Sequence, residues 1–128
     1  LMAALGDRVT LMHDVKEASA GTDLVVTDVW ASMGQEEEQK KRERDFANFQ
    51  VNSAVMALAK DDAIFMHCLP AFHNRETEIG EKIYQQFGLD AMEVTNDVFE
   101  SEHSIVFDQA ENRMHAQCAL ILHQLMSA

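Results

Sequence analysis

Short apolar runs alternate along this chain with segments that carry helix-capping signals. The runs cover residues 9–12, 24–29 and 63–67, with a shorter candidate at 92–94. Near-continuous apolar runs of this length, bounded by polar turns, are typical of parallel strands covered on both faces. The alternation of strand and helix favours right-handed βαβ units. The pattern therefore predicts an α/β fold with three layers and a mainly parallel sheet.

Local signals predict helices between these runs. Asp14, with Glu17 three residues later, forms a capping box for a short helix. Asn52 can cap a second helix, and apolar residues at positions 79, 83 and 87 predict a third, which stops at Gly88. A last helix should run from about residue 109 to the end, because one apolar stripe spans Met114, Cys118, Ile121, Leu122 and Leu125.

Length and charge narrow the classes of protein that fit. The 128 residues fit one domain, and we treat 1–128 as a single unit. The net charge of −12 opposes binding to nucleic acid and to anionic membranes. No apolar run approaches the roughly 20 residues that span a bilayer. Two cysteines without a disulfide framework fit a reducing compartment, so we expect a cytoplasmic protein.

The first residues predict that the chain is a fragment. Residues 1–5 resemble the last turn of a helix, and Gly6 follows as a stop signal. We therefore expect an α/β domain that is incomplete at its N-terminus.

Residues 34–45 contain no apolar side chain. Glutamates precede lysines and arginines at i, i+4 spacing, which supports a helix with nothing to bury. Two interpretations stay open: a solvated helix face, or a mobile lid between Trp30 and the pair Phe46 and Phe49. The second predicts that this segment is less ordered than its flanks.

Three polar clusters lie where an open α/β sheet binds ligands, just past the carboxyl ends of strands and at a helix start. Asp28 could hold an ammonium group, with Ser32 as a neutral hydrogen-bonding neighbour. Cys68 could be a nucleophile, if its thiolate is favoured, or could position an amine. Arg113 offers a planar fork for a carbonyl or an anion, and a place near a helix start favours an anionic partner.

Each of these residues also has a purely structural explanation. An aspartate at a strand end often caps a turn, and a lone cysteine is usually a small hydrophobic residue. His67, Cys68 and His73 do not match the spacing of a closed zinc site. Physical reasoning alone therefore predicts a ligand-binding domain for a small amine-bearing substrate.

The same clusters resemble motifs of the carbamoyltransferase family, in the same order. HCLP at residues 67–70 is similar to the signature of the ornithine branch, whereas the aspartate branch typically has proline at the cysteine position. DVWASMG at 28–34 resembles the ornithine-specific loop, and FDQAENRMH at 107–115 resembles the C-terminal motif. The resemblance runs from about residue 9 to the end and implies a Rossmann-like domain that binds L-ornithine.

The resemblance also implies roles for individual residues. Asp28 matches the carboxylate that binds the α-amino group of ornithine, and Ser32 and Met33 match its loop partners. Cys68 matches the cysteine beside the δ-amino group. The groups around the carbonyl of carbamoyl phosphate are matched by His67, the Leu69 backbone and Arg113.

The implied reaction is attack of the neutral δ-amine on carbamoyl phosphate, which gives citrulline and phosphate and needs no metal or organic cofactor. The family's two phosphate-binding motifs, which belong to its other domain, have no counterpart in this sequence. We therefore expect the chain to be inactive alone and its parent enzyme to be a trimer-based homo-oligomer.

An alternative is a stand-alone, non-catalytic module that binds an amino acid or a partner protein. An upstream sequence with the phosphate motifs would favour the fragment, and an initiator methionine close to Leu1 would favour the module.

Overall fold

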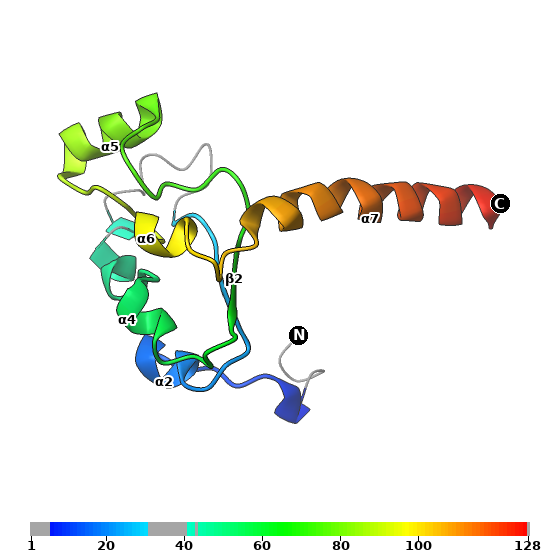
Figure 1. Cartoon of the computed structure of the whole chain (residues 1–128), viewed down its shortest axis with the longest axis horizontal. Coiled ribbons are helices and arrows are strands. Elements are labelled where there is room, and N and C mark those ends of the chain that lie inside the picture. The colour runs from blue at the N-terminus through cyan, green and yellow to red at the C-terminus, as the bar shows by residue number, and fades with distance from the viewer. Residues whose placement is uncertain (1–5, 31–40, 43, 128) are drawn as a thin grey trace.

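A parallel two-stranded sheet lies at the centre of the molecule (Figure 1). The computed structural model describes residues 6–30, 41–42 and 44–127. Strand β1 (Leu24–Thr27) pairs with β2 (Ile64–His67) in a register that runs from Leu24 opposite Ile64 to Thr27 opposite His67. The predicted α/β class and the parallel pairing are confirmed. Within the described ranges, no helix is long and apolar enough to cross a membrane.

The helices begin where the capping residues predict. In α2 (Val15–Ser19) the Asp14 carboxylate accepts from two backbone N–H groups of the first turn. In α4 (Ser53–Met56) the Asn52 side chain accepts from the backbone of Val55. Helix α5 (Glu78–Phe87) ends at Gly88, whose φ of 73° is the left-handed conformation that favours glycine. These three predictions are confirmed because their signals are local.

Three further short helical elements lie along the described chain. They are the 3₁₀ turns η1 (Gly6–Arg8) and η2 (Ala47–Phe49) and the helix α6 (Asn96–Phe99). Residues 41–42 and 44–46 are helical as well. Most of the segment 34–45 lies outside the described residues, so the ordering predicted for it stays a prediction.

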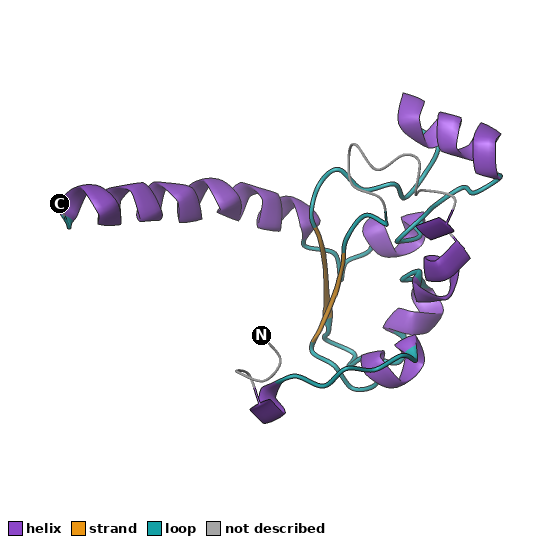
Figure 2. Cartoon of the chain, turned by 180° about the vertical axis from the view of Figure 1, so that it is seen from behind, coloured by secondary structure: helices purple, strands orange, loops and turns teal. Residues whose placement is uncertain are grey.

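The hydrophobic core lies on one face of the sheet. Phe65 of β2 is fully buried there, and the half-buried Val25 of β1 packs beside it. Helices α2, α4 and α6 lie on this side of the strands (Figure 2). The opposite face carries Leu24, Val26 and Ile64, which remain 37–59% exposed. The described residues therefore supply one helical layer for this sheet.

Two predicted strands take other conformations. Residues 9–12 are irregular, and Leu11 is 72% exposed. A strand needs hydrogen bonds from a neighbouring strand, and the described part of the chain places none beside this segment, so that prediction is wrong. Residues 92–94 form only a single parallel bridge, between Val94 and Val51, because α6 begins two residues later.

The last helix, α7 (Val106–Met126), is longer than predicted and projects away from the body of the molecule (Figure 1). It starts three residues before the expected position. Val106 is buried in the core, whereas Leu122 and Leu125 are 58% and 72% exposed. The apolar stripe that predicts this helix is therefore present, but residues 6–30, 41–42 and 44–105 leave it uncovered.

Candidate functional site

Asp28 and Cys68 lie together at the carboxyl edge of the sheet. Asp28 follows the end of β1 and Cys68 follows the end of β2, and because the strands are parallel these ends coincide. The thiol of Cys68 donates to Asp28 Oδ1 across 2.9 Å, and the backbone N–H of Val29 donates to the same oxygen across 2.7 Å. The predicted juxtaposition of these two residues is confirmed.

This contact shifts both pKa values in opposite directions. The hydrogen bond from Cys68, followed by that from Val29, lowers the pKa of Asp28. The hydrogen bond to Asp28, followed by burial, raises the pKa of Cys68 above its usual value. The carboxylate is therefore ionised and the thiol protonated near neutral pH. A protonated thiol is a poor nucleophile, so the geometry favours a positioning role for Cys68.

His67 is fully buried beneath this pair. Its Nδ1 donates to the carbonyl oxygen of Cys68, and its Nε2 lies 3.2 Å from Glu93 Oε1, off the axis of a hydrogen bond but close enough for an ion pair. Burial lowers the pKa of His67, but Glu93, the Cys68 carbonyl and Asp28 together outweigh it, so the pKa lies above its ordinary value. The ring thus faces protein groups on both sides and holds the backbone of Cys68.

Glu93 is a functional candidate that the sequence analysis missed. It is fully buried, and its Oε1 also accepts from the backbone N–H of Phe72, 2.8 Å away, in the loop after Pro70. A buried carboxylate needs a charged partner, and His67 supplies it. A charged residue between Met92 and Val94 in an apolar run was the available signal, because it must find such a partner once that run is buried.

The remaining predicted site residues are Leu69, Ser32, Met33 and Arg113. Leu69 follows Cys68 and is 42% exposed, in a loop where the Leu69–Pro70 peptide bond is cis. Ser32 and Met33 lie outside the described residues. Arg113 is exposed on α7, two turns beyond Val106, so the argument from the helix dipole does not apply to it.

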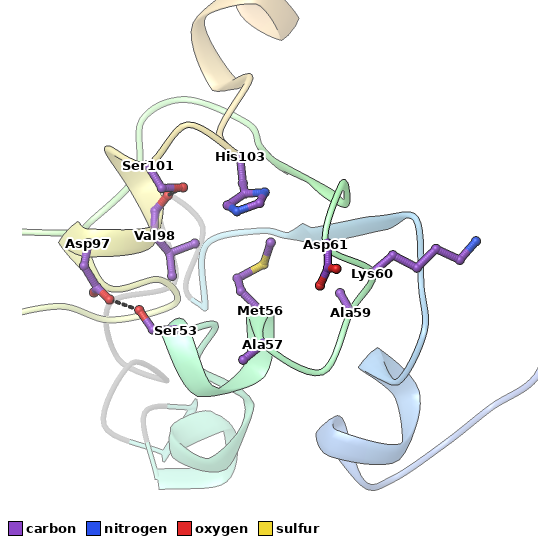
Figure 3. Close-up of a pocket in the computed structure, with 10 residues that line it drawn as sticks. All are labelled: Ser53, Met56, Ala57, Ala59, Lys60, Asp61, Asp97, Val98, Ser101 and His103. Atoms are coloured by element: carbon purple, nitrogen blue, oxygen red, sulfur yellow. Dashed lines mark hydrogen bonds between the residues drawn. The ribbon is translucent and has the colours of Figure 1, made fainter.

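A pocket of about 330 Å³ is lined in part by Lys60 and Asp61, just before β2, and so lies at the other end of this strand from Cys68. Figure 3 shows the residues that line it. Most of its polar lining groups already bond within the protein: Ser53 to Asp97, Lys60 to Asp23, Ser101 to the carbonyl of Val98, and His103 to the carbonyl of Ala63. This pocket therefore does not compete with the sheet edge as the candidate site. Across the ranges 6–30, 41–42 and 44–127, no cluster of three or more His, Cys, Asp or Glu side chains is arranged to hold a metal ion.

Comparison with known proteins shows the family to which the sequence is related. The sequence model for the aspartate/ornithine carbamoyltransferase family, Asp/Orn binding domain, matches residues 1–124. A catabolic ornithine carbamoyltransferase from Borreliella afzelii is 48% identical over 120 residues, which are 94% of this chain and 37% of that protein. The chain therefore spans little more than a third of this relative.

Solved structures agree with the sequence match. The ornithine carbamoyltransferase from Pyrococcus furiosus superposes with a TM-score of 0.67 and 44% identity, covering 86% of this chain and 30% of its own. The anabolic enzyme from Campylobacter jejuni gives 0.72 at 30% identity, over 91% and 33% of the two chains. The chain belongs to the aspartate/ornithine carbamoyltransferase family, whose Asp/Orn binding domain model it matches over residues 1–124.

Proposed function

We propose that this chain forms the ornithine side of an ornithine carbamoyltransferase active site. The observation that carries this proposal is the 2.9 Å contact between Cys68 and Asp28 at the carboxyl edge of the sheet. The contact joins the two motifs that resemble the ornithine branch, although they are far apart in sequence. The ornithine carbamoyltransferases among the relatives support the same reaction class.

The carboxylate of Asp28 suits the α-amino group of ornithine. Both hydrogen bonds that the described residues donate to Asp28 are made to Oδ1, so we assign Oδ2 as the acceptor for the ammonium group. The low pKa of Asp28, which the Cys68 hydrogen bond causes first, keeps the carboxylate charged for that contact.

Cys68 is then the residue that positions the δ-amine. In the proposed reaction the neutral amine nitrogen attacks the carbonyl carbon of carbamoyl phosphate, and an N–C bond forms. The C–O bond to phosphate breaks, the departing phosphate takes up the proton that the amine loses, and citrulline and phosphate result. Alignment of the attacking nitrogen is the contribution expected of a neutral thiol held by Asp28.

The buried side chains of His67 and Glu93 hold the backbone around Cys68 in place. Their buried pair holds the carbonyl of Cys68 from one side and the N–H of Phe72 from the other. Arg113 is the group proposed to stabilise the oxyanion that develops on the carbonyl oxygen.

The isolated chain should not form citrulline. Carbamoyl phosphate is a multiply charged anion, and phosphoryl groups are normally held by backbone N–H groups at a helix start together with Arg or Lys. The chain has a net charge of −12, and the family's two phosphate-binding motifs have no counterpart in its sequence.

The test is citrulline formation by the purified 128-residue chain at saturating concentrations of ornithine and carbamoyl phosphate. We expect no turnover above the blank. Turnover that Cys68→Ala abolishes would overturn the proposal that a second domain supplies the phosphate site.

A further inference from the structure

The edge of β2 that faces away from β1 is paired with a different segment of the chain. The N–H of Phe65 donates to the carbonyl of His103 across 2.7 Å, and the carbonyl of Phe65 accepts from the N–H of Ile105 across 3.0 Å. Because residues two apart in a strand point their backbone groups to the same edge, the N–H of His67 faces that edge too.

At His67 this neighbouring segment no longer offers a backbone carbonyl as acceptor. The neighbouring segment turns into α7 at Val106, so no further carbonyl of that segment continues the ladder. The side chain of Gln109 takes its place: its Oε1 accepts from the N–H of His67 across 3.1 Å. A side-chain amide thus completes the strand at the residue directly before Cys68.

This hydrogen bond joins the two elements that carry the proposed catalytic groups. Arg113 lies four residues after Gln109, one turn or about 6 Å further along α7 and on the same side of the helix. We propose that Gln109 is a positioning residue that sets α7, and with it Arg113, against the end of β2 that holds His67 and Cys68. The functional part of this inference rests on the proposed carbamoyl transfer.

The first test is hydrogen exchange at the His67 amide, measured by NMR on the full 128-residue chain. Gln109→Met removes the acceptor at nearly constant size, and its exchange should be about tenfold faster, the factor expected for one ordinary hydrogen bond. Gln109→Glu keeps an acceptor at the same reach and should restore protection. The matched control is Gln117→Met, at an exposed glutamine two turns further along α7.

The second test is the pH profile of Cys68 alkylation by iodoacetamide, in a Cys118→Ala background. The pKa of Cys68 is raised first by its hydrogen bond to Asp28. If Gln109 holds the end of β2, Gln109→Met lets the thiol move away from Asp28, and the profile shifts to lower pH. Gln117→Met should leave the profile unchanged.

Neither test depends on turnover, so the inference can fail while the proposed function stands, and the reverse. Faster exchange confined to His67, together with the shifted alkylation profile, would support a positioning role. Unchanged exchange in Gln109→Met would overturn it. So would faster exchange along the whole of β2 that Gln109→Glu does not restore, because that result would mean general loss of packing.

Discussion

Strand β2 and helix α7 carry the two sides of the proposed site, yet the protein holds them very differently. Phe65 and His67 of β2 are completely buried. Beyond its first turns, α7 is exposed on every described side chain, including Arg113. Its contacts with the body are concentrated at Val106, at Phe107, whose ring packs edge-on against Phe99, and at Gln109.

The difference shows which parts of the site this chain can build from its own residues. Asp28, Cys68, His67 and Glu93 are held by a sheet, a core and one another. Among the described residues, Arg113 is held through the first turns of its helix alone. The part of the site around Cys68 is therefore fixed by contacts within the folded body. The position of Arg113 depends instead on how the first turns of α7 are attached to that body.

The largest expected effect is on stability. Phe65→Ala should lower the free energy of unfolding by about 3–5 kcal/mol, because it empties a fully buried position of the core. Leu122→Ala removes a similarly apolar side chain from α7 but should change the free energy of unfolding by less than about 0.5 kcal/mol. Urea denaturation followed by circular dichroism measures both. Equal losses would mean that α7 is packed as tightly as β2.

Glu93→Gln tests the buried pair and should cost about 1–3 kcal/mol, because His67 loses its charged partner. The pKa of folded His67 lies above its ordinary value of 6.5. The stabilisation that His67 gains from pairing with Glu93 is therefore fully present below the pKa of His67 in the unfolded chain. It is lost as the pH rises through the pKa of His67 in the folded chain. The stability gap between wild type and Glu93→Gln should be wider at about pH 6 than at about pH 9.

The control for this pH dependence is Glu111→Gln, which removes one carboxylate from the exposed surface of α7. It should leave both the stability and its pH dependence nearly unchanged. A gap for Glu93→Gln that is constant from acid to alkaline pH would contradict the ion pair.

The smallest effect should follow from shortening α7. A chain that ends after Ala116 should keep its free energy of unfolding within about 0.5 kcal/mol, because the side chains of residues 117–127 are exposed. Trp30, which is 7% exposed, reports unfolding by fluorescence without depending on helix content. A loss as large as that of Phe65→Ala would show that α7 covers the core.

The features that could be predicted from the sequence are those with local signals. The caps at Asp14 and Asn52 and the stop at Gly88 need only neighbouring residues. The meeting of Asp28 and Cys68 follows from two strong apolar runs in parallel, since residues that leave such strands share one edge.

The features that could not be predicted depend on partners far away in the sequence. Residues 9–12 have strand-like composition, but a strand also needs a neighbour, and composition does not supply one. The pairing of Glu93 with His67 and of Gln109 with the His67 backbone exists only once the fold brings those segments together.

The most direct test of the account is turnover in a complete subunit. The matching portion of the Borreliella afzelii enzyme, which is 37% of that protein, would be replaced by this chain, and citrulline formation measured. We expect an active chimera in which Cys68→Ala and Arg113→Ala each lower kcat by roughly 100-fold or more, while the matched control Cys118→Ala, at the exposed cysteine of α7, keeps full activity. A folded, active chimera in which Cys68→Ala behaves like Cys118→Ala would contradict the proposed site.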